Sequence, residues 1–180
     1  MALTKVRGLG LGTLDDNITF STAGKGVHLG VTSATSSNLL DDYEEGTFLP
    51  SCNFTSAAPS SGATQGKGQY TKIGRQVHLH FLLSNINVTG ASGDIQIQNM
   101  PFTAIPDSGD GAVANFVGVA KSNFINFAGS TFLNSQIADN TTNCKITECI
   151  YNSAADVITA SNCSDGTTDI IVSVSYTTAA

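Results

Sequence analysis

Four carboxylates crowd around one tyrosine at residues 41–45 of this sequence. Asp41 and Asp42 precede Tyr43, and Glu44 and Glu45 follow it. General acid–base catalysis needs two carboxylates held apart across a cleft, which neighbours on one exposed segment do not provide. A calcium site needs about six to eight oxygens with a turn between ligands, and this spacing does not match that pattern. We therefore interpret the cluster as a solvated joint whose acids contact Lys or Arg of a neighbouring chain.

Two histidines, His78 and His80, lie two residues apart and so point to the same side of a strand. In a monomer this is an ordinary half-exposed strand face, which is the interpretation we favour. In a trimer with this strand on the axis, six imidazoles would meet and could hold an octahedral transition metal. No CxxC pair is present, and the histidines are not spaced from the cysteines as zinc sites require. We expect no bound metal and no cofactor.

The sequence carries no signal for catalysis. A hydrolase triad would need a histidine base beside a serine and an aspartate. His28 lies far from the other two histidines in the chain, and no GxSxG motif is present. The protein is therefore predicted not to be an enzyme.

Loops rich in Asn, Ser and Asp offer polar groups that could bind a glycan, and an exposed tyrosine such as Tyr70 could stack on a sugar ring. Loops of this composition are also ordinary connections, so composition alone does not select one. The candidates for receptor contact are Asp107, Asp110, Asn140, Asn143, Tyr151 and Asp165.

Composition indicates which elements hold these residues. Charged residues make up only 12% of the chain, whereas 21 Thr, 19 Ser and 14 Asn account for 54 of its 180 residues. Such residues disfavour helices and favour strands and turns. An all-β protein is the first inference.

Charge and cysteine usage exclude some partners. Residues 90–180 hold eight acids against Lys121 and Lys145, which gives this half the whole net charge of −6. An acidic surface repels phosphate, so we expect neither nucleic acid nor an anionic membrane as a partner. The N-terminus lacks a long apolar run, so we expect neither a signal peptide nor membrane insertion. We expect synthesis in a cytoplasm. The four cysteines, Cys52, Cys144, Cys149 and Cys163, are then expected to stay unpaired thiols.

From Thr47 onward, short stretches with period-two alternation follow one another between turns. The two clearest stretches have apolar residues at every second position, from Val77 to Leu83 and from Ile170 to Tyr176. About nine such strands without helical periodicity predict a jelly-roll-like antiparallel β-sandwich over residues 47–180.

Residues 1–46 are expected to form an extended or β arm. The alternating stretches at residues 18–21 and 27–31 are too small a pair to bury an apolar face alone. Three copies around an axis would supply the missing layer. The arm is therefore predicted to trimerise the protein or dock it on a partner, and the alternative is an arm folded back on its own domain.

Two stretches together resemble the head domains of tailed-phage tail fibres and tail spikes. The first is NLLDDYEEGTFLP at residues 38–50, and the second is GQYTKIGRQV at residues 68–77. In those proteins an LLDDYEEGTW-P stretch joins a trimeric stalk to a β-rich tip, and a YTKIG-R-V strand follows. Phe48 stands here where the family pattern has tryptophan. Less specific similarities lie at residues 93–102 and 165–176.

The resemblance implies a virion structural protein, made in the host cytoplasm. It would be a homotrimeric short tail fibre or knob that adheres to the host surface, with a surface glycan as a candidate ligand. The arm would bind other virion proteins. The alternatives are a capsid head decoration or cement protein and, less favoured, a tail spike that cleaves polysaccharide.

Overall fold

The computed structural model describes residues 18–22, 24–33, 35, 38–106, 115–127 and 131–179. The chain forms two compact units, Met1–Asp41 and Asp42–Ala180, and we call the second the body. The predicted boundary lies after residue 46. The structure places it earlier because residues 43–46, expected to remain a solvated joint, form a strand that pairs with the body.

The first unit contains one small antiparallel pair. Strand β1 (Val27–His28) lies beside β2 (Leu39–Leu40), whereas residues 18–21 form no strand. Among its described residues no side chain is buried, so this part of the chain has no core of its own. Its exposed large apolar residues are Ile18, Phe20, Val27, Leu29, Val31 and Leu40.

The body is built almost entirely of strands, and the predicted all-β, sandwich-like class is confirmed. A single short 3-10 helix, η2, is found among its described residues. The elements are β3 (Tyr43–Phe48), β4 (Ser51–Phe54), β5 (Thr64–Gln65), β6 (Lys67–Ile73), β7 (Gln76–Ile86), β8 (Ile95–Gln98), β9 (Asn115–Asn123), β10 (Thr131–Ala138), β11 (Cys144–Ile150), β12 (Asp156–Val157), η2 (Ala160–Asn162) and β13 (Thr168–Thr177).

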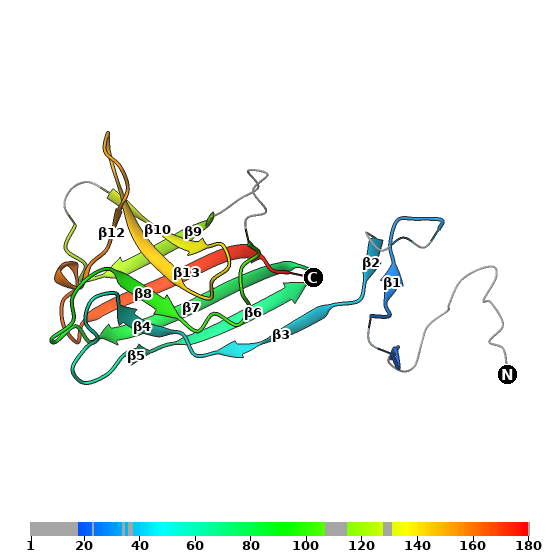
Figure 1. The fold of residues 1–180 in the computed structure, drawn as a ribbon, viewed down its shortest axis with the longest axis horizontal. Helices are drawn as coiled ribbons and strands as arrows, with labels where there is room; N and C mark the ends of the chain where they lie inside the picture. Colours follow the sequence, from blue (N-terminus) through cyan, green and yellow to red (C-terminus); the bar gives the residue numbers. More distant parts are fainter. Residues whose placement is uncertain are drawn as a thin grey trace. The chain divides into compact units, whose positions relative to one another are not determined.

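These strands follow one hydrogen-bonded path, β3–β6–β7–β13–β9–β10–β11–β8–β4–β5, with β12 on β11. The pairings are antiparallel, and β13 lies in the middle of the path between β7 and β9. The sheet curls into a half-barrel (Figure 1). Hydrogen bonds thus join the strands into one sheet, whereas a jelly roll has two.

The core lies inside the curl. On β7 and β13 the alternate apolar residues that sequence analysis assigned to one face are buried, and β8, β10 and β11 add theirs. The buried Tyr176 hydroxyl donates to the Phe102 carbonyl at 2.9 Å, so its polar atom is satisfied. The largest fully buried side chains are Tyr176, Phe81, Leu79, Leu83, Ile86, Ile95, Ile97, Ile137, Ile146, Ile158, Ile170 and Val77.

The two motif stretches found in the sequence pair with each other, as β3 and β6. In the register Gly46 faces Tyr70 and Gly68 faces Phe48. A Cβ atom on Gly68 would lie 2.3 Å from the Phe48 ring, and one on Gly46 would lie 2.9 Å from the Tyr70 ring. Each ring therefore occupies the space over a glycine of the other strand. From there Phe48 meets Phe81 edge-on, with ring centroids 5.9 Å apart.

The substitution Gly68→Ala is expected to destabilise the body by about 1–3 kcal/mol, the range for forcing extra atoms into a packed site. The added methyl group would displace the Phe48 ring. Urea unfolding followed by circular dichroism measures the loss. In a Phe48→Ala background the same glycine substitution is expected to cost little. An equal cost in both backgrounds would show that the ring is not the cause.

Candidate functional site

The acidic cluster does not act as one unit in the structure. Asp42 forms an ion pair with Lys72 of β6, whose side chain is only 10% exposed. The Lys72 Nζ also lies 5.6 Å from the centroid of the Phe102 ring, which Tyr70 meets edge-on. A buried ammonium needs an opposite charge, because desolvation without a partner is costly. Asp42 therefore neutralises a lysine of its own chain, where we had expected a neighbouring chain.

The other cluster residues are exposed. Glu44 is the register partner of Lys72. The Tyr43 hydroxyl donates to Glu45 Oε2 at 3.0 Å, and this bond together with the glutamate charge raises the pKa of Tyr43. Asp41 ends the first unit. Among the described strands β3 pairs only with β6, so it is an edge strand, and carboxylates along such an edge discourage unwanted strand pairing.

His78 and His80 lie on the exposed outer face of β7. The Nδ1 atom of His78 is 3.0 Å from the hydroxyl of Ser175 on the neighbouring strand β13. Across the described ranges, no three His, Cys, Asp or Glu side chains gather closely enough to hold a metal ion. A six-imidazole site would require several chains, and it stays a prediction about their assembly.

The candidate loop residues divide between opposite ends of the body. Asn140 and Asn143 lie at the end where the chain enters the body. Strand β3 begins at Tyr43, at the end of the sheet where β13 finishes. Just after β13, Thr178 forms a bridge with Ala104, whose carbonyl accepts the Asn140 N–H at 3.1 Å. The turn that holds Asn140 and Asn143 therefore lies at that same end.

Tyr151 and Asp165 lie at the other end, where β7 finishes and β13 begins (Figure 1). Tyr151 is 92% exposed. The Asp165 carboxylate accepts the Val88 N–H at 2.7 Å, the Thr89 N–H at 3.1 Å and the Thr89 hydroxyl at 2.6 Å. These bonds, that of the Thr89 hydroxyl first, hold the pKa of Asp165 below its usual range. Asp165 thus fixes a neighbouring loop with the oxygens that a receptor would need.

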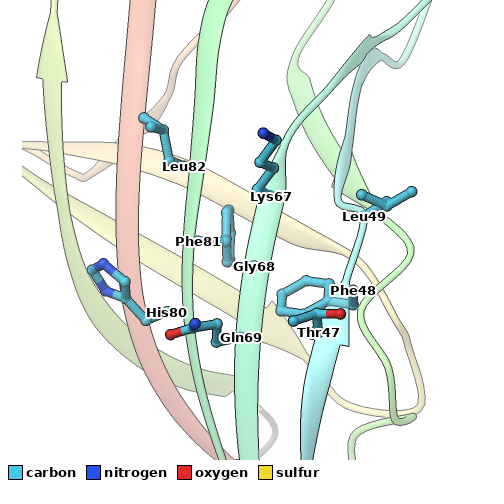
Figure 2. A pocket seen from close by; sticks show the side chains of 9 residues that line it. All are labelled: Thr47, Phe48, Leu49, Lys67, Gly68, Gln69, His80, Phe81 and Leu82. Carbon is cyan, nitrogen blue, oxygen red and sulfur yellow. The ribbon is translucent and has the colours of Figure 1, made fainter.

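A hollow that the sequence patterns do not reveal lies over β3, β6 and β7. It encloses about 440 Å³, and Figure 2 shows its nine lining residues. Its shape follows from the local chain path. Pairing of β3 with β6 ends where Phe48 faces Gly68, and the chain then crosses to β4 through Leu49 and Pro50. Because Gly68 has no side chain, the Phe48 ring lies over it, and both residues line the hollow.

Two rows of side chains line this hollow (Figure 2). Thr47, Gln69 and His80 are register partners on three neighbouring strands, and Lys67 is the partner of Leu82 in the next row. Within the described part of the chain, none of the four polar side chains has a hydrogen bond or an ion pair. Leu82 is 40% exposed. The hollow therefore combines free polar groups with apolar surface.

The remaining sequence-based candidates do not join this hollow. Asp107 and Asp110 lie outside the described residues. The cysteines are free thiols, and burial raises the pKa of Cys52 and Cys144 to about 12 and of Cys163 to about 11. Such thiols are poor nucleophiles at neutral pH. As far as the chain is described, it holds no helix with the length and apolar character needed to cross a membrane.

The substitution Asp165→Asn is expected to lower the melting temperature at neutral pH, because the amide cannot replace both acceptor oxygens. A depressed folded pKa stabilises the fold above the unfolded pKa, near 3.8, and this contribution disappears as the pH falls through the folded value. Wild type and variant should therefore converge in thermal unfolding curves recorded toward pH 2. A difference that persists unchanged into acid would contradict this role of the carboxylate.

Comparison with known proteins finds a likeness of fold. The crystal structure of the Dettilon tailspike protein matches 75% of this chain with a TM-score of 0.55 and 14% sequence identity. The match spans 24% of that tailspike's length. No protein-family model matches the sequence, and no curated protein does. At this identity the likeness concerns the fold: this chain folds like part of a phage tailspike.

Proposed function

We propose that this protein is a virion component of a tailed phage, a short trimeric tail fibre or knob that adheres to the host surface. The likeness of its fold to part of a tailspike carries the proposal. The motif resemblance at residues 38–50 and 68–77 points the same way. Made in the host cytoplasm, the protein would reach its place when the virion assembles.

The first unit would hold the protein in the virion. Its described residues include six exposed large apolar side chains, and none of its described side chains is buried. Apolar surface of this kind is unfavourable in water, and a second surface that covers it gains roughly 25 cal/mol per Å² buried. We assign to this unit the contacts among three copies and with another virion protein.

The body would carry the adhesion. Its chain enters at the end that holds Tyr43 and Asn140, and the end with Tyr151 lies a full β7 away, roughly 35 Å at about 3.3 Å per residue. Three copies of a weak site gain avidity on a surface that repeats its epitope, so no single copy needs a deep pocket. Adhesion needs no catalytic group, and purified protein should leave host polysaccharide uncut.

Immunogold labelling of intact virions tests the placement. Antibody against the body is expected to label the tail and to inhibit adsorption of the phage to its host. Label distributed over the capsid, with loss of capsid stability in particles that lack the protein, would contradict this proposal and support a decoration or cement role.

The mass in solution tests the trimer. By light scattering, the full chain is expected at about three times 18.6 kDa, and a chain starting at Asp42 is expected to be a monomer. Truncation at Asp42 keeps β3, which a start at Thr47 would disrupt. A second test is the full chain with Leu29→Ser and Val31→Ser, which is also expected to be a monomer. A full chain that is monomeric would leave the trimer without support in the isolated protein.

A further inference from the structure

The hollow over β3, β6 and β7 is the middle of a longer groove. A second hollow, of about 410 Å³, shares Thr47 and Gln69 with it and continues toward Glu45 and Thr71. A third, of about 450 Å³, shares three of its residues and continues in the opposite direction toward Ser84. We call the three together the outer groove. It follows the chain from the end of β5 into β6, from residue 65 to residue 71, roughly 20 Å at about 3.3 Å per residue.

The charges of the outer groove differ from those of the rest of the body. Residues 42–180 contain eleven acids and five basic residues, yet the central hollow is lined by Lys67 and His80 and by no carboxylate. Lys67 has no ion pair among the described residues, whereas Lys72 is neutralised by Asp42. Glu45 lines only the far hollow. The centre of the groove therefore favours one negative group on its ligand.

The hydrogen-bonding groups of the groove suit a sugar. The Thr47 hydroxyl, the Gln69 amide and the His80 ring together offer hydrogen-bond donors and acceptors. Leu49 is 60% exposed and Leu82 is 40% exposed, and they supply apolar surface for the C–H face of a sugar ring. A peptide cannot pair along β6 as an added strand, because the backbone groups of β6 are already paired with β3 and β7.

We propose that the outer groove binds an extended acidic glycan, with a sugar carboxylate placed at Lys67. This inference rests on the proposed adhesion to the host surface and names its site and ligand class. One lysine matches a polymer with sparse charge, whereas a phosphate at every unit would call for a row of cations. The ligand lies across the face of the sheet, and the loop residues at either end of the body are not needed for it.

Binding of the full-length protein to immobilised bacterial surface polysaccharides, some with uronic acids and some neutral, tests the groove. The uronic acid polymers of the host are expected to bind. The affinity should fall about tenfold or more in Lys67→Gln and in Gln69→Ala, because each loses a direct contact. The matched control is Lys121→Gln, which removes the same charge from exposed strand β9 outside the groove, and it should bind like wild type.

Equal thermal unfolding of the variants confirms that exposed groove residues were changed without harm to the fold. Binding only to neutral polymers, to no polymer, or with equal affinity by groove variants and wild type would overturn the inference. Competition with phage adsorption separates this failure from that of the proposed function. If groove variants block adsorption as well as wild type does, adhesion stands and the groove is wrong. If wild type fails to block adsorption, the proposed function itself is wrong.

Discussion

The reciprocal packing of two aromatic rings over two glycines between β3 and β6 determines much of the molecule. It attaches the first strand of the body to the rest of the sheet and carries Phe48 to its contact with Phe81. It also borders the outer groove, since both Phe48 and Gly68 line its central hollow. One local constraint thus links the stability of the edge strand to the form of the candidate binding site.

Much of the fold could be predicted from the sequence, because burial on one face of a strand leaves a period-two pattern. The alternations from Val77 to Leu83 and from Ile170 to Tyr176 are the central strands of the core. The pairing of strands could not be predicted, since nothing local in residues 168–177 specifies that they lie between β7 and β9. The strand at residues 43–48 could not be predicted for the same reason: its partner lies in a distant segment.

The candidate site was harder to predict than the fold. Residues are easily identified as candidates when they cluster along the chain, such as the acids at 41–45, or stand out by type, such as His80. The outer groove takes most of its residues from three different strands, β3, β6 and β7, so its members are far apart in the sequence. A signal does exist: Leu82 interrupts the otherwise polar outer face of β7, beside the polar alternation of β6. Its meaning becomes visible only once those strands are neighbours.

The position of β13 has a consequence for how the protein is made. This strand, residues 168–177, joins the two halves of the sheet, so the hydrogen-bonded path has a gap at its centre until those residues have left the ribosome. Until then, apolar residues on the inner faces of β7 and β9 stay exposed to water. Pairings between segments so distant in sequence also form slowly. The central pairing of the body therefore cannot form before residues 168–177 have been made.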